Sequence, residues 1–528
     1  MPSTLQLLAA VSVPVFGYIA SQLLAFRRAR NTYSEWLLGS YVFGSVTILG
    51  NLLPHVPFVI YGKGVRVRPA YHKRYQKLGW DAEVEVTMSP KVAAAVTICD
   101  AEVIKLIASS NARFPKPVEL YELLLVFGSN IVASSGDLWK RHRRIAAPAF
   151  SERNNRLVWD ESIRVVDEVF ESWGSGEVHI SDAKAFTLNV TLLVLSIASF
   201  GKRISWDEKH VAPPGYRFTF GDALHIVSER MVYKVLVPAS IQAYTIPRIR
   251  DAFEDFTKYM KDMVHRQRVS ASSQSGDEKY DLLSGLVTAS NAEDETGALS
   301  EEELLGNVFM FLLAGHETSR HSLAITLTLL ALHQDEQAKL HDHVAGLLEG
   351  RASFPGYDQY GIFTRAVAVL YEGLRLYPAV LAVPKKTAEP TTFIIGSAVP
   401  GSDKKRTLSV PADTLVMLDI QGMHRNPRYW NDPDTYNPCR FLDSDWPRDA
   451  FAPFALGPRA CLGRRFAEAE SVVLISRLIH KYRVQLAPCH GLERREGENM
   501  VAHRDRVLRL RDGITLTPLA VPLVFTPR

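Results

Sequence analysis

The segment Phe454-Ala-Leu-Gly-Pro-Arg-Ala-Cys-Leu-Gly463 places one cysteine, Cys461, between two glycines and just before a helical pattern that runs from Arg464 to about Tyr482. Glycines permit tight turns around a sulfur atom, and the free N–H groups at a helix start favour a thiolate over a thiol. A thiolate held in this way is a natural axial ligand for haem iron, and Arg459 could hold a propionate. A lone cysteine is more often a small buried hydrophobe, so this interpretation needs support from other segments.

A second stretch predicts a long helix at the centre of the molecule. Ser300-Glu-Glu-Glu303 has the pattern of a capping box, and the helical pattern continues for roughly 30 residues to about Leu332. From Leu304 to Leu313 the pattern is apolar nearly all round, which indicates burial. The polar cluster Ala314-Gly-His-Glu-Thr-Ser319 then interrupts it, and an acid and a hydroxyl inside a buried helix suggest chemistry.

These two stretches resemble motifs of the cytochrome P450 family. The segment from Phe454 to Gly463 matches the family's haem-binding signature F-x-x-G-x-R-x-C-x-G at every fixed position. Four more motifs occur in the family's order and are similar to its W-x-x-x-R, oxygen-activation, E-x-x-R and P-x-R-F motifs: Trp139-Lys-Arg-His-Arg143, Ala314-Gly-His-Glu-Thr318, Glu372-Gly-Leu-Arg375 and Pro438-Cys-Arg-Phe441. Alone, each motif has an ordinary structural explanation, but their ordered occurrence from about residue 60 to the end favours the family.

The resemblance implies a role for each matched residue. Cys461 would be the axial ligand of the iron in haem b, and Thr318 and Glu317 would be catalytic groups that deliver protons. Glu372, Arg375 and Arg440 would form a buried ion-paired network behind the haem. The remaining residues of the haem site would be Trp139, Arg143, Ala314, Gly315, Phe454, Arg459 and Gly463.

Two positions depart from the family's pattern. Lys385 stands where a propionate-binding arginine is common, and a lysine offers a point charge without the bidentate fork of a guanidinium. Cys439 stands where many members have glutamate in P-x-R-F, and we do not interpret it as a second ligand.

The expected fold class is mainly α with smaller β-sheets (α+β), as in the cytochrome P450 family, with residues 69–528 forming the catalytic domain. Strand patterns occur before residue 100, where Ala82–Thr87 alternates, and between about residues 380 and 420. The chain has 528 residues and a formal net charge of +4, which is too mild to indicate a nucleic-acid binder. Its four cysteines include no C-x-x-C pair, which argues against a disulfide framework and the common zinc spacings.

The N-terminus predicts a membrane anchor within residues 1–30. No charged side chain occurs from Met1 to Phe26, and at about 1.5 Å per residue this stretch is long enough to cross a hydrocarbon core of about 30 Å. Arg27, Arg28 and Arg30 follow, and the positive-inside rule places them in the cytosol. A cleaved signal peptide fits less well, because the charges follow the apolar run.

A second apolar stretch, Trp36–Ile60, lies within residues 31–68 and contains several glycines and prolines. It could be a re-entrant or membrane-surface segment, a second span, or simply buried core. The sequence leaves these alternatives open.

The resemblance implies a monooxygenase of the fungal microsomal type, on the cytosolic face of the endoplasmic reticulum. It would use O₂ and electrons from NADPH–cytochrome P450 reductase, which carries the flavins, with cytochrome b5 as an additional partner. The candidates for docking that acidic partner are Lys140, Arg141, Arg144, Arg464 and Arg465.

The substrate expected from the small apolar stretch Ala379–Val383 is a hydrophobic small molecule such as a terpenoid, a steroid or another lipid-like secondary metabolite. Three alternatives are a haem-thiolate isomerase or dehydratase that needs no O₂, a non-catalytic haem sensor, and a membrane scaffold without a cofactor.

Overall fold

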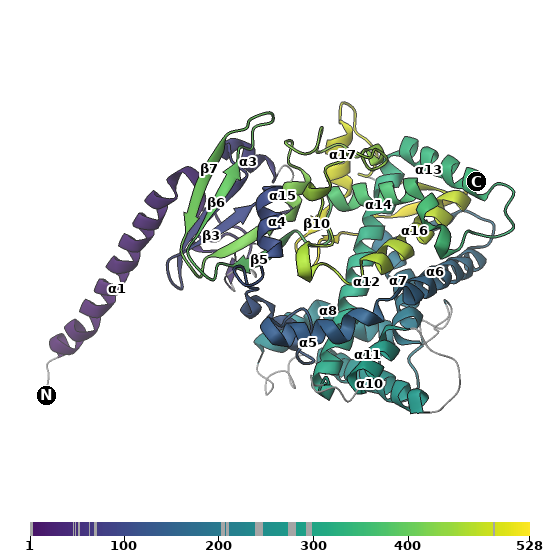
Figure 1. Cartoon of the computed structure of the whole chain (residues 1–528), viewed down its shortest axis with the longest axis horizontal. Helices are drawn as coiled ribbons and strands as arrows, with labels where there is room; N and C mark the ends of the chain where they lie inside the picture. Colours follow the sequence, from purple (N-terminus) through teal and green to yellow (C-terminus); the bar gives the residue numbers. More distant parts are fainter. Residues whose placement is uncertain are drawn as a thin grey trace.

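The computed structural model describes residues 4–45, 47, 49–50, 53–62, 64–67, 71–201, 206, 211–237, 247–272, 281–291, 298–488 and 491–528. Helices dominate it, and the sheets are small, so the mainly α (α+β) architecture predicted from the sequence is confirmed. Figure 1 shows the larger sheet at one side of the molecule and most of the helices at the other, with the long helix α12 (Glu301–Leu332) between them.

The larger sheet has five strands in the order β1-β2-β3-β8-β5. Its pairs alternate in direction, because β1 is parallel to β2, β2 antiparallel to β3, β3 parallel to β8, and β8 antiparallel to β5. The strands are β1 (Leu37–Phe43), β2 (Ala82–Ser89), β3 (Ala93–Ile98), β5 (Ala382–Lys386) and β8 (Leu415–Asp419). The strand regions predicted before residue 100 and between 380 and 420 therefore meet in one sheet.

The other sheets are smaller and antiparallel. One is the hairpin of β6 (Thr391–Gly396) and β7 (Lys405–Val410). Another joins β4 (Val178–Ile180), β12 (Leu523–Pro527) and β9 (Tyr482–Leu486), and a third pairs β10 (Leu510–Arg511) with β11 (Thr517–Pro518). The last strands therefore fold the C-terminus back onto the helical side.

Helix α12 begins where the capping box predicts. The Ser300 hydroxyl accepts a hydrogen bond from the Glu303 N–H at 3.2 Å, and the Glu303 carboxylate accepts one from the Ser300 N–H at 2.9 Å. The helix packs against α7 (Ala183–Phe200), α14 (Thr364–Leu376) and α16 (Arg464–Lys481). Most of its residues from Leu304 to Leu313 are buried, as the apolar pattern predicts.

Further helices surround this core. The α-helices are α3 (Lys73–Leu78), α4 (Ala101–Ser109), α5 (Gly136–Ala146), α6 (Glu152–Trp173), α8 (Phe220–Leu236), α10 (Pro247–Ser272), α11 (Leu282–Asn291), α13 (Gln334–Leu348), α15 (Ile420–His424) and α17 (Met500–Val507). The short 3-10 turns are η1 (Ser34–Trp36), η2 (Val118–Leu125), η3 (Ala147–Ala149), η5 (Tyr357–Ile362), η6 (Pro438–Phe441), η7 (Arg448–Ala450) and η8 (Gly457–Arg459).

The N-terminal apolar stretch forms the helix α1 (Thr4–Thr32), which projects from the body of the molecule (Figure 1). Most of its described apolar side chains are exposed, such as Phe16 at 72%, whereas Phe26 and Ala29 near its end are half-buried against the body. Residues 1–3, and the side chains of residues 4–12, 14 and 15, lie outside the described part, so the anchor remains a proposal. Among described side chains, the one helix long and apolar enough to cross a membrane is α7, which is 72% buried inside the protein and is therefore a core helix.

The second apolar stretch packs on the body of the molecule. Trp36 is buried with its ring 5.8 Å from that of Trp80, and Leu37–Phe43 forms strand β1, which pairs with β2. A strand of the body's sheet is not a transmembrane helix, so this part of residues 31–68 fits the buried-core alternative and not a second span.

Candidate functional site

The Cys461 segment is a closed turn between η8 and α16. The N–H of Cys461 donates to the carbonyl oxygen of Phe454 at 2.9 Å, which holds the two ends of the turn together. Gly457 has φ +70°, and a Cβ there would lie 2.5 Å from the carbonyl oxygen of Ala108 in α4, so this position requires glycine. Gly463, in contrast, has the ordinary φ of −83° and does not use glycine's freedom.

The Cys461 side chain is accessible, but neighbouring groups of the protein still shift the pKa of its thiol. Burial raises the pKa of the Cys461 thiol, while a hydrogen bond from the Gly463 N–H and the charge of Arg464 lower it. In this protein burial outweighs the favourable start of α16, which the sequence argument did not anticipate. A coordinating metal ion deprotonates a thiol outright, so this thiol is suited to bind iron as a thiolate.

Two arginines from distant segments share one aromatic ring near this turn. The Arg459 guanidinium lies 4.3 Å from the centroid of the Trp139 ring and donates to the Ser134 carbonyl oxygen at 3.0 Å. Arg143, one helical turn after Trp139 on α5, lies 5.8 Å from the same centroid. The structure therefore brings together the W-x-x-x-R residues and the arginine of the Cys461 segment.

Two lysines complete this group of cations. The Lys385 Nζ donates to Asn111 Oδ1 at 3.0 Å, and the Lys116 Nζ donates to the Val132 carbonyl oxygen at 2.5 Å. Burial and the charges of Arg459 and Lys385 lower the pKa of Lys116 to about 7, and burial and Arg459 lower that of Lys385 to about 8. Burial also lowers the pKa of Arg459 to about 10. We call Lys116, Arg143, Lys385 and Arg459 the cation cradle.

Within the described residues, none of the four members of the cation cradle makes an ion pair with a carboxylate. Lys385 is buried and the other three are half-buried. Cations withdrawn from water without a counter-charge are costly, and an anion at this place would relieve that cost. The two propionates of haem supply such a charge, so the residues present fit haem. The sequence analysis missed Lys116, because a single lysine between two prolines has no motif spacing that relates it to Arg459.

On α12 the structure separates the two residues predicted to be catalytic. Ala314 is exposed in the middle of a mostly buried helix, and the Thr318 hydroxyl donates to the Ala314 carbonyl oxygen at 2.7 Å. Gly315 and Thr318 are half-buried near this opening. Glu317 is buried and pairs with Arg320 at 3.4 Å, so it does not share the opening with Ala314. Burial raises the pKa of Glu317, and Arg320 lowers it.

Glu372, Arg375 and Arg440 are in contact. Arg375 and Glu372 of α14 are completely buried, and Arg375 donates to the two Glu372 oxygens at 2.6 and 2.8 Å. Arg440 of η6 donates to Glu372 Oε1 at 3.4 Å. Arg375 also donates to the carbonyl oxygens of His424 and Pro433 at 2.9 and 2.8 Å, which fixes the chain before η6 against α14.

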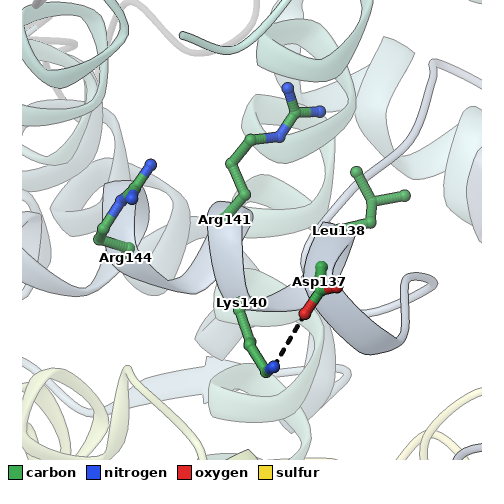
Figure 2. A pocket seen from close by; sticks show the side chains of 5 residues that line it. All are labelled: Asp137, Leu138, Lys140, Arg141 and Arg144. Carbon is green, nitrogen blue, oxygen red and sulfur yellow. Dashed lines mark hydrogen bonds and ion pairs between the residues drawn. The ribbon is translucent and has the colours of Figure 1, made fainter. Parts of the chain in front are cut away.

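Most of the cations proposed for docking have carboxylate partners within the protein, which the sequence does not indicate. Figure 2 shows a hollow on α5 lined by Asp137, Leu138, Lys140, Arg141 and Arg144. Lys140 pairs with Asp137 at 2.8 Å, and Arg141 pairs with Glu303. Arg464 and Arg465 are exposed, but both reach Glu468, at 2.8 and 3.0 Å.

A sequence profile described as cytochrome P450 matches residues 52–508. The chain belongs to the cytochrome P450 family. Family and fold together imply that this P450 binds haem, and its relatives are named cytochrome P450 monooxygenases.

Two fungal proteins are among the most similar relatives. Cytochrome P450 monooxygenase 124 of Postia placenta is 41% identical over 528 residues, and the match covers 98% of each chain. Cytochrome P450 monooxygenase ORF6 of Penicillium roqueforti is 30% identical over 486 residues, covering 84% of this P450 and 81% of the relative. The crystal structure of the cytochrome P450DA heme domain has the same fold, with a TM-score of 0.68 and 22% identity over 92% of this P450 and 98% of that chain.

Proposed function

We propose that this P450 is a haem-thiolate monooxygenase that uses O₂ and NADPH-derived electrons to oxidise a hydrophobic small molecule. The observation that carries this proposal is the combination of an accessible cysteine in a closed turn with a cation cradle that has no carboxylate partner among the described residues. Cys461 would ligate the iron, and the cation cradle with Trp139 would hold the propionates. Phe454 and Gly463 shape the turn that presents the sulfur.

Haem supplies the redox chemistry that activates oxygen, and the chain's own residues supply space and protons. Ala314 and Gly315 carry little or no side chain and leave room beside α12. The Thr318 hydroxyl now donates to the Ala314 carbonyl oxygen, and rotation about its Cα–Cβ bond would turn the proton toward that room. Glu317, on the neighbouring face, would take up protons from solvent and pass them on.

Apolar surface near the end of α14 supports the proposed substrate class. Val380 is 40% exposed in the turn between α14 and β5, while Ala379 and Leu381 beside it are buried. A small apolar side chain that is accessible in an otherwise buried turn suits contact with a hydrocarbon. Within this proposal the substrate is a terpenoid, a steroid or another lipid-like secondary metabolite.

The electron donor in this proposal is NADPH–cytochrome P450 reductase, with cytochrome b5 as a further partner. The exposed cations Lys140, Arg144, Arg464 and Arg465 lie on α5 and at the start of α16, beside Trp139 and Cys461 respectively. The Lys140–Asp137 pair is exposed on both sides, so it contributes little stability and could exchange for an acidic partner. Arg464 and Arg465 pair with the buried Glu468 and would present only their exposed sides to that partner. With α1 as anchor, the catalytic domain would face the cytosol from the endoplasmic reticulum membrane.

The experiment that tests the proposal is the absorption difference spectrum of the reduced protein with and without carbon monoxide. We expect the strongly red-shifted Soret band of a thiolate-ligated haem, lost in Cys461→Ser. Cys439→Ser is the matched control, because Cys439 is also exposed, lies in η6, and should leave the band unchanged.

A spectrum typical of histidine ligation, or folded protein without haem, would overturn the assignment. Turnover assays with and without NADPH, reductase and O₂ then separate the reaction classes. Conversion that continues without NADPH and O₂ would support an isomerase or dehydratase instead, and failure of any reductase to reduce the protein would support a sensor.

A further inference from the structure

A buried polar cluster lies beside Glu317 on α12, and Arg320 is at its centre. Arg320 is 3% exposed, and its guanidinium contacts three side chains of the same helix. Its Nη2 donates to Glu317 Oε1 at 3.4 Å, its Nε donates to His321 Nε2 at 3.1 Å, and its Nη1 lies 3.5 Å from His316 Nε2. Glu317 is the only carboxylate among these contacts.

The two histidines leave the charge of Arg320 uncompensated. Burial and the charge of Arg320 lower the pKa of His316 far below its usual range and that of His321 to about 2, so both rings are neutral. His321 is also fixed from outside the helix, since its Nδ1 lies 3.0 Å from the Thr515 hydroxyl. The Glu317 carboxylate is therefore the group in contact with Arg320 that can balance its charge.

The backbone of Arg320 is fixed as well. The Thr187 hydroxyl of α7 lies 2.8 Å from the Arg320 carbonyl oxygen and bonds to it, so two packed helices hold this turn in place. Glu317 and Arg320 are three residues apart on one helix, so their approach depends on α12 and not on the docking of another element. Burial acting alone would favour a protonated Glu317, and Arg320 opposes that effect.

We propose that Arg320 is a positioning residue for Glu317: its guanidinium holds the Glu317 carboxylate on the buried face of α12, one residue before Thr318. This inference rests on the proposed function, in which Glu317 and Thr318 move protons to the reacting oxygen. Arg320 itself does not contact the opening at Ala314; it acts only through the Glu317 carboxylate.

Other charged groups also surround this pair. They are His316 and His321 of α12, His225 and Glu229 of α8, Asp182 and Lys184 at the start of α7, and Arg511 of β10. All of them remain in the variants proposed below, so a change between those variants reports on Glu317 and Arg320.

The first measurement is the pH profile of coupling, meaning product formed per NADPH consumed, in the full-length haem-loaded protein. Removing the charge of Arg320 raises the pKa of Glu317, so in Arg320→Gln the acid limb of the profile should move to higher pH by about one unit or more. Arg320→Lys keeps a charge at this position and should restore much of the shift. In Glu317→Gln that limb should disappear.

Arg164→Gln is the matched control. Arg164 pairs with Glu161 at 2.5 Å with the same three-residue spacing, but on α6. Its profile should coincide with that of the unmodified protein. An acid limb that stays in place in Arg320→Gln, or one that moves equally in Arg164→Gln, would overturn the proposal.

The second measurement needs no turnover. Thermal unfolding of Glu317→Gln, Arg320→Gln and the double variant forms a cycle, in which the double variant should lose less than the sum of the single losses, because it leaves no unpaired charge. Additive losses would overturn the pairing even if Arg320→Gln proved too unstable to assay. Absence of NADPH- and O₂-dependent turnover in the unmodified protein would instead overturn the proposed function. The unfolding cycle would still test whether Glu317 and Arg320 interact.

Discussion

The Thr318 hydroxyl makes a bond that any buried threonine in a helix makes, so its catalytic role has to be tested against that ordinary role. Thr318→Ala removes only the bond to the Ala314 carbonyl oxygen, and we expect haem binding and stability to remain. Without the hydroxyl, more of the NADPH consumed should end as hydrogen peroxide. Measuring product, NADPH and peroxide in the same reaction gives the fraction of NADPH that ends in product and the fraction that ends in peroxide.

Thr328→Ala is the control for this prediction. The Thr328 hydroxyl donates to the Ala324 carbonyl oxygen at 2.8 Å on the same helix, and this threonine is buried away from the opening. Thr328→Ala should form as much product per NADPH consumed as the unmodified protein. Normal coupling in Thr318→Ala would remove the assigned role.

The lysines of the cation cradle predict a pH dependence of haem binding. Without haem, the pKa values of Lys116 and Lys385 are lowered to about 7 and about 8. Propionates favour the charged amines, so binding takes up protons and haem affinity should fall as pH rises through this window. Transfer of haem to an acceptor protein, followed from pH 6.5 to about 9, measures the effect.

The double variant Lys116→Arg with Lys385→Arg is the comparison, because guanidinium groups stay charged throughout this range. Its haem transfer should depend much less on pH. An unchanged slope would show that these two lysines do not face the propionates.

The sequence predicted some residues of the candidate site and missed others. Motif spacing identified Cys461, Arg459, Trp139 and Arg143 as candidates, and in the structure both arginines lie near the Trp139 ring, a contact that the motifs do not specify. Lys116 could not be found, because only the fold brings its segment to the Cys461 turn. The separation of Glu317 from Thr318 was also missed, since the motif gives their order but not the partner that holds each side chain.

The buried Glu372 carboxylate links α14 to η6, because it accepts hydrogen bonds from Arg375 and Arg440. Glu372→Gln leaves the buried Arg375 and the nearby Arg440 without their counter-charge, so we expect a loss of unfolding free energy of about 3–5 kcal/mol and poor haem retention. Chemical denaturation measures the first, and the ratio of haem to protein after purification measures the second.

Glu389→Gln is the exposed counterpart, because Glu389 pairs with Arg113 at 3.0 Å on the surface. Surface ion pairs contribute about 0–1 kcal/mol, so little change is expected. Equal losses in the two variants would argue against a special role for the α14–η6 network.

At the scale of elements, the helices were more predictable than the strands. The capping box and periodicity located both ends of α12, and the pattern after Cys461 located α16. Strand β1 was not recognised, because a short apolar run of this kind does not distinguish strand from helix. Its parallel partner β2 lies far along the chain, and sequence alone offers no register for such a pair.

For the whole molecule, the structure separates a projecting helix from a body that begins shortly after it. A chain that starts at Tyr33 should fold, bind haem and stop sedimenting with membranes, because it lacks α1 and keeps the sheet. A chain that starts at Gly44 loses β1 and the Trp36–Trp80 contact, so it should unfold at a lower temperature. Sedimentation and thermal unfolding of the two truncations would show both effects.

Full membrane sedimentation of the chain that starts at Tyr33 would place the anchor outside α1. Equal unfolding temperatures of the two truncations would show that β1 adds nothing to the body. The size of the chain and the order of its motifs were sufficient to predict the fold class. The boundary between the projecting helix and the body depends on the pairing of β1 with β2, which composition does not reveal.

The short connection between α1 and the sheet has a mechanical consequence. Only Tyr33 separates α1 from η1, η1 leads directly into β1, and both Tyr33 and Trp36 are buried. Such a short, buried connection contains no flexible linker, so it limits rotation of the body relative to α1. With α1 in the bilayer as proposed, the haem plane should therefore keep a narrow range of tilt angles, which polarised absorption of aligned bilayers would record as strong linear dichroism.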